Sequence, residues 1–137
     1  MGTLAGRGTL EECAWAVGHY INIEEHIVEA LMGSEQTKEE LLHLCKAVYY
    51  TRMRIAEIYL KLNGLSIENS IVRNYWCVLK HFLSVQVHLQ ELSSMLERDG
   101  LTELSKEVAG LYKETVKLRK LFIDILKKAT QQGEGNE

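Results

Sequence analysis

The chain has 137 residues, enough for one domain with a substantial hydrophobic core. Its apolar and charged fractions, 46% and 26%, are ordinary for a globular protein. The net charge of −3 excludes a general electrostatic attraction to nucleic acid or to an anionic membrane surface, so neither is an expected partner.

No apolar run is long enough to cross a bilayer, and residues 1–8 lack the basic and then apolar composition of a signal peptide. The three cysteines, Cys13, Cys45 and Cys77, are odd in number and are spaced for neither a zinc motif nor a disulfide framework. Reduced cysteines inside helices are the simplest interpretation, and we expect a cytoplasmic protein.

The chain contains no proline, so no helix interior meets the residue most able to break it. After a flexible, glycine-rich segment, the first helix is predicted over residues 9–32, with Thr9 as its N-cap and Gly33 as its stop. A capping box that starts at Thr37 opens the second helix. This helix is predicted to end at about residue 63.

The third helix is predicted over residues 66–98, with Ser66 opening it and Gly100 just past its end. The fourth is predicted over residues 102–129. The remaining residues 130–137 have no apolar anchor, and we expect a flexible C-terminal tail.

Four helices joined by connections this short must be antiparallel neighbours. The sequence therefore predicts an all-α, up-down-up-down four-helix bundle over residues 9–129. Residues 19–29 and 81–91 share both histidines and the closing glutamate at an offset of 62. This similarity indicates either a duplicated helical hairpin or the general resemblance between amphipathic helices.

The third helix carries two apolar strips at helical spacing. The main strip, which we assign to the bundle core, contains Ile71, Tyr75, Val78, Phe82, Val85, Leu89, Leu92 and Leu96. The second strip contains Val72, Trp76, Leu79, Leu83 and Val87. A helix that is apolar around most of its circumference is buried on more than one side, so we expect the second strip to form a homodimer interface. The alternative is that the long N-terminal segment folds over it.

The fourth helix has the clearest apolar strip, which we also assign to the core. It contains Leu104, Val108, Leu111, Leu118, Phe122, Ile125 and Ala129. The opposite side is rich in lysine and is expected to face solvent.

Two charged residues are predicted near the centres of apolar helix faces, Glu24 on the first helix and Arg52 on the second. Because either is costly to bury unpaired, we expect them to pair, with tyrosine hydroxyls completing the hydrogen bonds. Their heights above the connecting loop differ by about six residues, roughly 9 Å. The alternatives are that one or both meet a dimer mate or a ligand, and that Arg52 holds a carboxylate or phosphate in a pocket lined by Tyr49 and Tyr59.

Two histidine–glutamate pairs have the three-residue spacing of a chelating pair on one helix, His26 with Glu29 and His88 with Glu91. In an up-down bundle their helices run parallel on the diagonal, so a duplication would place the two pairs at equal height. Such a set would suit zinc, iron or manganese. However, all four histidines of the repeated segments lie at the flanks of apolar helix faces. Histidines in such positions usually pack against the edge of the core. We therefore expect no cofactor.

The sequence shows neither a phosphate-binding glycine loop nor a nucleophile with a base on a shared face, which favours a non-enzymatic role. We expect a small non-catalytic interaction or scaffold protein that self-associates through its third helix, with a further protein as a second kind of partner. The alternatives are a metal-binding bundle with redox or hydrolytic chemistry, and a small anionic-ligand pocket around Arg52.

Overall fold

The computed structural model describes residues 6–33 and 38–135. The described chain forms four helices, α1 (Arg7–Gly33), α2 (Lys38–Leu62), α3 (Ser70–Arg98) and α4 (Thr102–Gly135). The protein is an all-α, four-helix bundle, as the sequence predicts. None of these helices combines the length and the apolar character that a membrane span requires.

Three helix ends differ from the sequence prediction. The first helix begins two residues before Thr9, and the amide of Leu10 donates to the carbonyl of Gly6. The third helix begins at Ser70 instead of Ser66, because the side chain of Asn69 accepts hydrogen bonds from the amides at positions 71 and 72, at 2.9 and 3.3 Å. The fourth helix continues past residue 129 to Gly135. The predicted cap at Thr37 lies outside the described residues.

Two glycines end helices by adopting positive φ. Gly64 has a φ of 74°, and the amide of Leu65 donates to the carbonyl of Leu60 at 2.8 Å. Gly100 has a φ of 80°, and the amide of Leu101 donates to the carbonyl of Leu96 at 2.9 Å. Both turns satisfy carbonyls that the helix leaves without partners, in a backbone conformation that glycine adopts at no steric cost.

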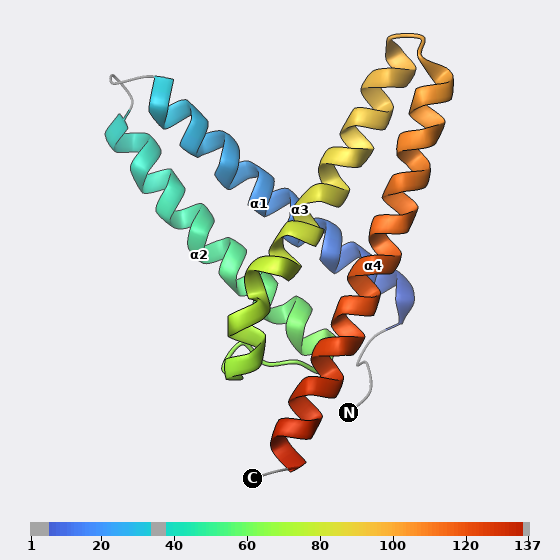
Figure 1. Ribbon diagram of the computed structural model, residues 1–137. Helices are drawn as coiled ribbons and strands as arrows, with labels where there is room; N and C mark the ends of the chain where they lie inside the picture. Colours follow the sequence, from blue (N-terminus) through green and yellow to red (C-terminus); the bar gives the residue numbers. More distant parts are fainter. Residues whose placement is uncertain (1–5, 34–37, 136–137) are drawn as a thin grey trace.

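The helices form two antiparallel hairpins, α1–α2 and α3–α4, which diverge like the arms of a V (Figure 1). The closely packed pairs are α1 with α2, α3 with α4, and α1 with α3. The hairpins therefore meet where α1 crosses α3, and these two helices are direct neighbours, not diagonal ones as expected.

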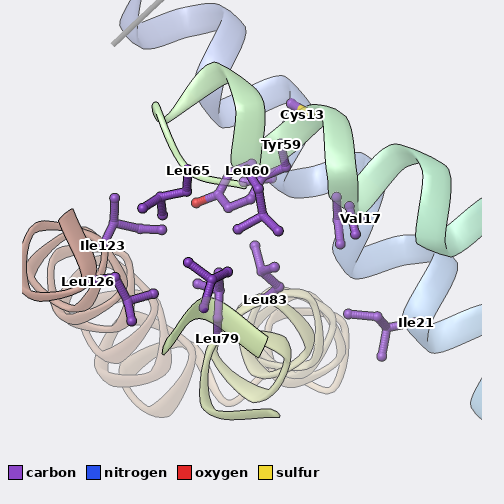
Figure 2. Packing of buried hydrophobic residues seen from close by; sticks show 13 residues of the cluster. Cys13, Val17, Ile21, Tyr59, Leu60, Leu65, Leu79, Leu83, Ile123 and Leu126 are labelled. Atoms are coloured by element: carbon purple, nitrogen blue, oxygen red, sulfur yellow. The ribbon is translucent and has the colours of Figure 1, made fainter. Parts of the chain in front are cut away.

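The hydrophobic core lies at the closed end of the V. It is built from the first half of α1, the second half of α2, the first half of α3 and the second half of α4. Figure 2 shows members from all four helices converging, among them Val17, Leu60, Leu79 and Leu126. Burial of such side chains contributes about 1.5–3 kcal/mol each to folding, so this end of the V carries most of the stability.

The two apolar strips of α3 have the opposite roles to those predicted. The second strip, expected at a dimer interface, lies inside the monomer: Leu79, Leu83 and Val87 are 0% exposed, Val72 is also buried, and Trp76 packs against the core. The interface prediction for these five residues is wrong, because the α1–α2 hairpin packs over the strip. The alternative, coverage by the long N-terminal segment, falls largely on residues 1–5, which lie outside the described residues.

Most members of the strips predicted for the core lie instead on the side of the α3–α4 hairpin that faces away from it, whereas Ile71 and Phe122 do pack against the core. We call this surface the outer face. Its members are 40–57% exposed and are Tyr75, Val78, Val85, Leu92 and Met95 on α3, with Leu104, Leu111, Leu118, Leu121 and Ile125 on α4. Ring contacts of Phe122 with Tyr75 and Phe82, at centroid distances of 6.4 and 5.9 Å, join the two helices beneath it.

The crossing of α1 and α3 depends on Gly18. A Cβ atom at this position would lie 2.5 Å from the carbonyl oxygen of Leu83 and 2.7 Å from Cγ2 of Val87. Only glycine lets the two backbones approach this closely, so this residue sets the distance between the hairpins.

Gly18→Ala should therefore lower the free energy of unfolding by about 1–2 kcal/mol, because forced repacking exceeds the gain in helix propensity. Gly110→Ala is the matched control: Gly110 is inside α4 with open space around it, and alanine there should raise the free energy by up to about 1 kcal/mol. Urea unfolding of both variants measures the difference. Equal stabilisation by both would refute the close crossing.

Candidate functional site

Arg52 and Glu24 pair across the α1–α2 hairpin. Arg52 is 5% exposed, and its Nε donates a hydrogen bond to Oε2 of Glu24. The ring of Tyr49 packs against the guanidinium group, with Cζ of Arg52 5.0 Å from the ring centroid. The structure thus joins the two charged groups that the sequence places on apolar faces.

The expected height difference between Glu24 and Arg52 does not keep them apart, because helical side chains lean toward the N-terminus of their own helix. Glu24 lies nearer the connecting loop and leans away from it. Arg52 lies further from the loop and leans toward it. In antiparallel helices the two side chains therefore point toward each other. This direction, together with the length of the arginine side chain, spans the separation along the helix axes.

A pocket of about 240 Å³ opens between α2 and α3 beside this pair; we call it the Arg52 pocket. It is lined by Tyr49, Arg52, Met53, Ala56, Glu57, Ile67, Trp76, Cys77 and Lys80. Of the two tyrosines predicted to line a pocket around Arg52, the structure places Tyr49 there and Tyr59 elsewhere.

Tyr59 belongs to a second buried charged cluster, centred on Arg119, that sequence reasoning missed. Arg119 is 1% exposed, and its Nη2 donates to both carboxylate oxygens of Glu11, at 2.8 and 2.9 Å. Its Nη1 donates to the hydroxyl of Tyr59 at 3.2 Å. Lys120 lies 3.4 Å from the same carboxylate of Glu11. This cluster ties α4 to both helices of the other hairpin.

A sequence signal for Arg119 does exist. It belongs to a series of every seventh residue on α4, with Ser105, Tyr112 and Leu126, all buried or partly buried. Tyr112 of this series accepts a hydrogen bond from Nε1 of Trp15 at 3.0 Å. The series contains few aliphatic residues, so the neighbouring strip of leucines, which is exposed, gives the stronger hydrophobic pattern.

Glu11→Gln should lower the free energy of unfolding by about 3 kcal/mol, because it leaves the buried guanidinium charge of Arg119 uncompensated. Arg119→Met should cost less, about 1 kcal/mol, because it removes the charge and keeps most of the side-chain volume. Glu103→Gln is the control: Glu103 pairs with Lys106 at 3.6 Å on an exposed surface, where the loss should stay below about 0.5 kcal/mol. Chemical denaturation of the three variants ranks them, and a larger loss for Arg119→Met than for Glu11→Gln would contradict this account.

Burial raises the pKa of the Tyr59 phenol, an effect that the neighbouring Arg119 partly offsets. Above about pH 10 the phenol in the unfolded chain loses its proton while the folded protein retains it. The free energy of unfolding should therefore fall as the pH rises through this range. In Tyr59→Phe this fall should be shallower, whereas Tyr50→Phe, at an exposed position, should match the wild type in alkaline denaturation curves.

Of the residues predicted as metal ligands, His88 and Glu91 contact α1, whereas His26 and Glu29 contact each other, so the two pairs do not converge. Nδ1 of His26 lies 3.6 Å from Oε2 of Glu29, both on the exposed side of α1. Nε2 of His88 lies 3.4 Å from Oε2 of Glu25, and Oε1 of Glu91 accepts a hydrogen bond from Asn22 at 3.3 Å.

Within the described residues, no group of three or more histidine, cysteine or acidic side chains is arranged to hold a metal ion. Each of the pairs that the structure does form supplies two ligands, whereas zinc sites in proteins use three or four. Comparison of the chain with known protein families, curated proteins and solved structures found no match. The described residues form two other candidate sites, the outer face and the Arg52 pocket.

Proposed function

We propose that this protein is a small, non-catalytic interaction protein that forms a homodimer through the outer face of α3 and α4. The observation that carries the proposal is the continuous run of half-exposed apolar side chains along both helices. Single exposed apolar residues need no explanation, but a continuous patch of this kind on a globular protein indicates a surface that a partner covers.

The size of the outer face fits a second copy of the chain. Its ten large side chains each leave about half of their surface exposed, which amounts to roughly 800 Å², the area that each partner contributes to a stable interface. A second hairpin of the same kind would turn the two-helix layer into a four-helix arrangement with an apolar centre. In a twofold dimer both copies use the same patch, so assembly stops at two subunits.

The edges of the outer face are also complementary to each other. His81 and His88 follow the edge of α3, and Glu107 and Glu114 follow the edge of α4. The Ser93 hydroxyl donates to the carbonyl of Ser105, and the Ser105 hydroxyl donates to that of Ser93, at 3.0 and 2.7 Å, so these serines lie level.

Because the helices are antiparallel, nine residues forward from Ser105 on α4 correspond to nine residues backward from Ser93 on α3. Glu114 therefore lies level with position 84, between His81 and His88. A twofold axis parallel to the helices would place α4 of the second copy beside α3 at the same height. Glu114 of that copy would then lie about 4.5–6 Å along the axis from each histidine. Because His88 already pairs with Glu25 of its own chain, His81 is the histidine that would meet this carboxylate, and that contact favours a second copy of the chain over an unrelated helix.

A groove along this edge of α3 provides room for that helix. It has a volume of about 620 Å³ and is lined by Glu25, Val78, His81, Phe82, Ser84, Val85 and His88. Val78, Phe82 and Val85 are its apolar members, and Glu25, His81, Ser84 and His88 are its polar ones, a mixture that is ordinary for a protein interface.

Leu111→Glu should weaken self-association at least about a hundredfold, because it buries an unpaired carboxylate at the centre of the interface. Leu111 is half exposed in the monomer, so the helical content of the variant should not change. Sedimentation equilibrium over a series of protein concentrations measures the dissociation constant.

Lys113→Gln is the matched control, since it changes the net charge by the same amount at an exposed position of α4 outside the outer face, and it should remain dimeric. A wild-type protein that stays monomeric at the highest soluble concentration would refute the proposal. So would a dimer that Leu111→Glu leaves intact.

A further inference from the structure

The Arg52 pocket holds a buried cation whose hydrogen-bonding capacity is largely unused. A guanidinium group has five N–H donors. Nε of Arg52 is engaged by Glu24, and no side chain of the described residues accepts a hydrogen bond from either Nη atom. Arg52 is almost fully buried, yet neither Nη atom is among the buried side-chain atoms that lack a hydrogen-bond partner, so both remain accessible to water or to a ligand. The group lines an open pocket, so an acceptor can reach it from the pocket side.

The two Nη atoms of Arg52 determine which shape of acceptor fits the pocket. With Nε occupied by Glu24, the two Nη atoms remain as a fork at the end of the side chain. A carboxylate matches this fork with two parallel hydrogen bonds, the strongest geometry that arginine forms with an anion. Glu24 fixes the guanidinium plane from the other side, so the fork is oriented before a ligand arrives.

The charges of the lining favour a single negative charge on the ligand. Lys80 on α3 is a second cation facing the pocket, and Glu57 on α2 is the acid in the lining. Glu24 pairs with Arg52 and Glu57 offsets Lys80, so these four groups together carry no net charge. A monocarboxylate adds one negative charge to this site, whereas a phosphate monoester adds two beside the carboxylates of Glu24 and Glu57.

The rest of the lining fits a flat apolar body. Met53, Ala56 and Ile67 are aliphatic or thioether side chains, and the indole of Trp76 forms part of the wall. Trp76 and Ile67 also pack against the core, so this wall is held in place by the fold. Aromatic rings pack favourably against indole and methionine side chains.

The volume of the Arg52 pocket limits the size of the ligand. About 240 Å³ corresponds to roughly eight waters of the bulk liquid, which is below the range of drug-sized ligands. From these observations we propose that the Arg52 pocket binds a compact aromatic monocarboxylate, with its carboxylate on Arg52 and Lys80 and its ring against Trp76. No residue of this lining belongs to the outer face, so binding is independent of dimerisation.

Titration with benzoate and 3-phenylpropionate tests the proposal, with 3-phenylpropanamide and inorganic phosphate as comparisons. The chain has two tryptophans, and Trp76 lies in the pocket while Trp15 lies against Tyr112 on α4. In a Trp15→Phe background the fluorescence therefore reports on the pocket alone, and calorimetry on the wild type gives the stoichiometry. We expect one carboxylate per chain to bind, and the neutral amide to bind at least tenfold more weakly.

Two variants separate the contacts. Arg52→Lys retains the positive charge beside Glu24 but loses the fork, and should weaken carboxylate binding at least tenfold. Lys80→Met, at a half-buried position, should weaken it severalfold with no loss of fold, and Lys117→Met on the solvent side of α4 should leave it unchanged. Circular dichroism checks that each variant folds.

If Arg52→Lys does not fold, the comparison of carboxylate with amide and the Lys80→Met variant still decide the question. Equal binding of carboxylate and amide, binding unaffected by Lys80→Met, or preference for phosphate would overturn the proposal. Absence of binding by both carboxylates at millimolar concentration would overturn it as well.

Discussion

The contact between α1 and α3 at Gly18 is the constraint on which the rest of the structure depends. Each hairpin is held together by its own two helices, but the core at the closed end of the V exists only because the hairpins approach closely at one point. The missing side chain at Gly18 lets the α1 backbone rest against the carbonyl of Leu83. That contact covers the buried strip of α3, and it leaves the other strip of the same helix uncovered.

Helix number, topology and most helix ends follow from the sequence, because they depend on local signals. Glycines at positions 64 and 100 stop helices through positive φ, and the periodic apolar strips identify the helices between them. The side of α3 that faces the core does not follow from such signals. Two strips with the same seven-residue spacing lie side by side, and hydrophobicity favours the wrong one, since the inner series of α3 includes the buried Gln86. Only the position of α1 distinguishes them.

The two buried arginines show the same difference between features that local sequence signals predict and features that depend on tertiary packing. The sequence identifies Arg52 because its neighbours on α2 are strongly apolar, and its pairing with Glu24 follows from charge and burial. The sequence does not identify Arg119, because the series to which it belongs contains serine and tyrosine and because its partner Glu11 is more than one hundred residues away in the chain. A pairing between the first and last helices depends on tertiary geometry, which helix periodicity does not encode. The unused donors of Arg52 likewise become visible only when its partners are known.

The concentration of the core at one end of the V has a consequence for motion. Away from that end each arm is a two-helix layer, in which amide hydrogen bonds are protected by few buried side chains. The free energy of local opening should therefore decrease along each arm from the crossing to the tip, so that amide hydrogens exchange slowly near Leu83 and progressively faster toward Gly100. A partner that covers the outer face would slow exchange along α3 and α4 and leave the gradient in α1 and α2 in place. Association would thus convert one arm of the V from a fluctuating hairpin into a rigid layer, while the other arm retained its freedom.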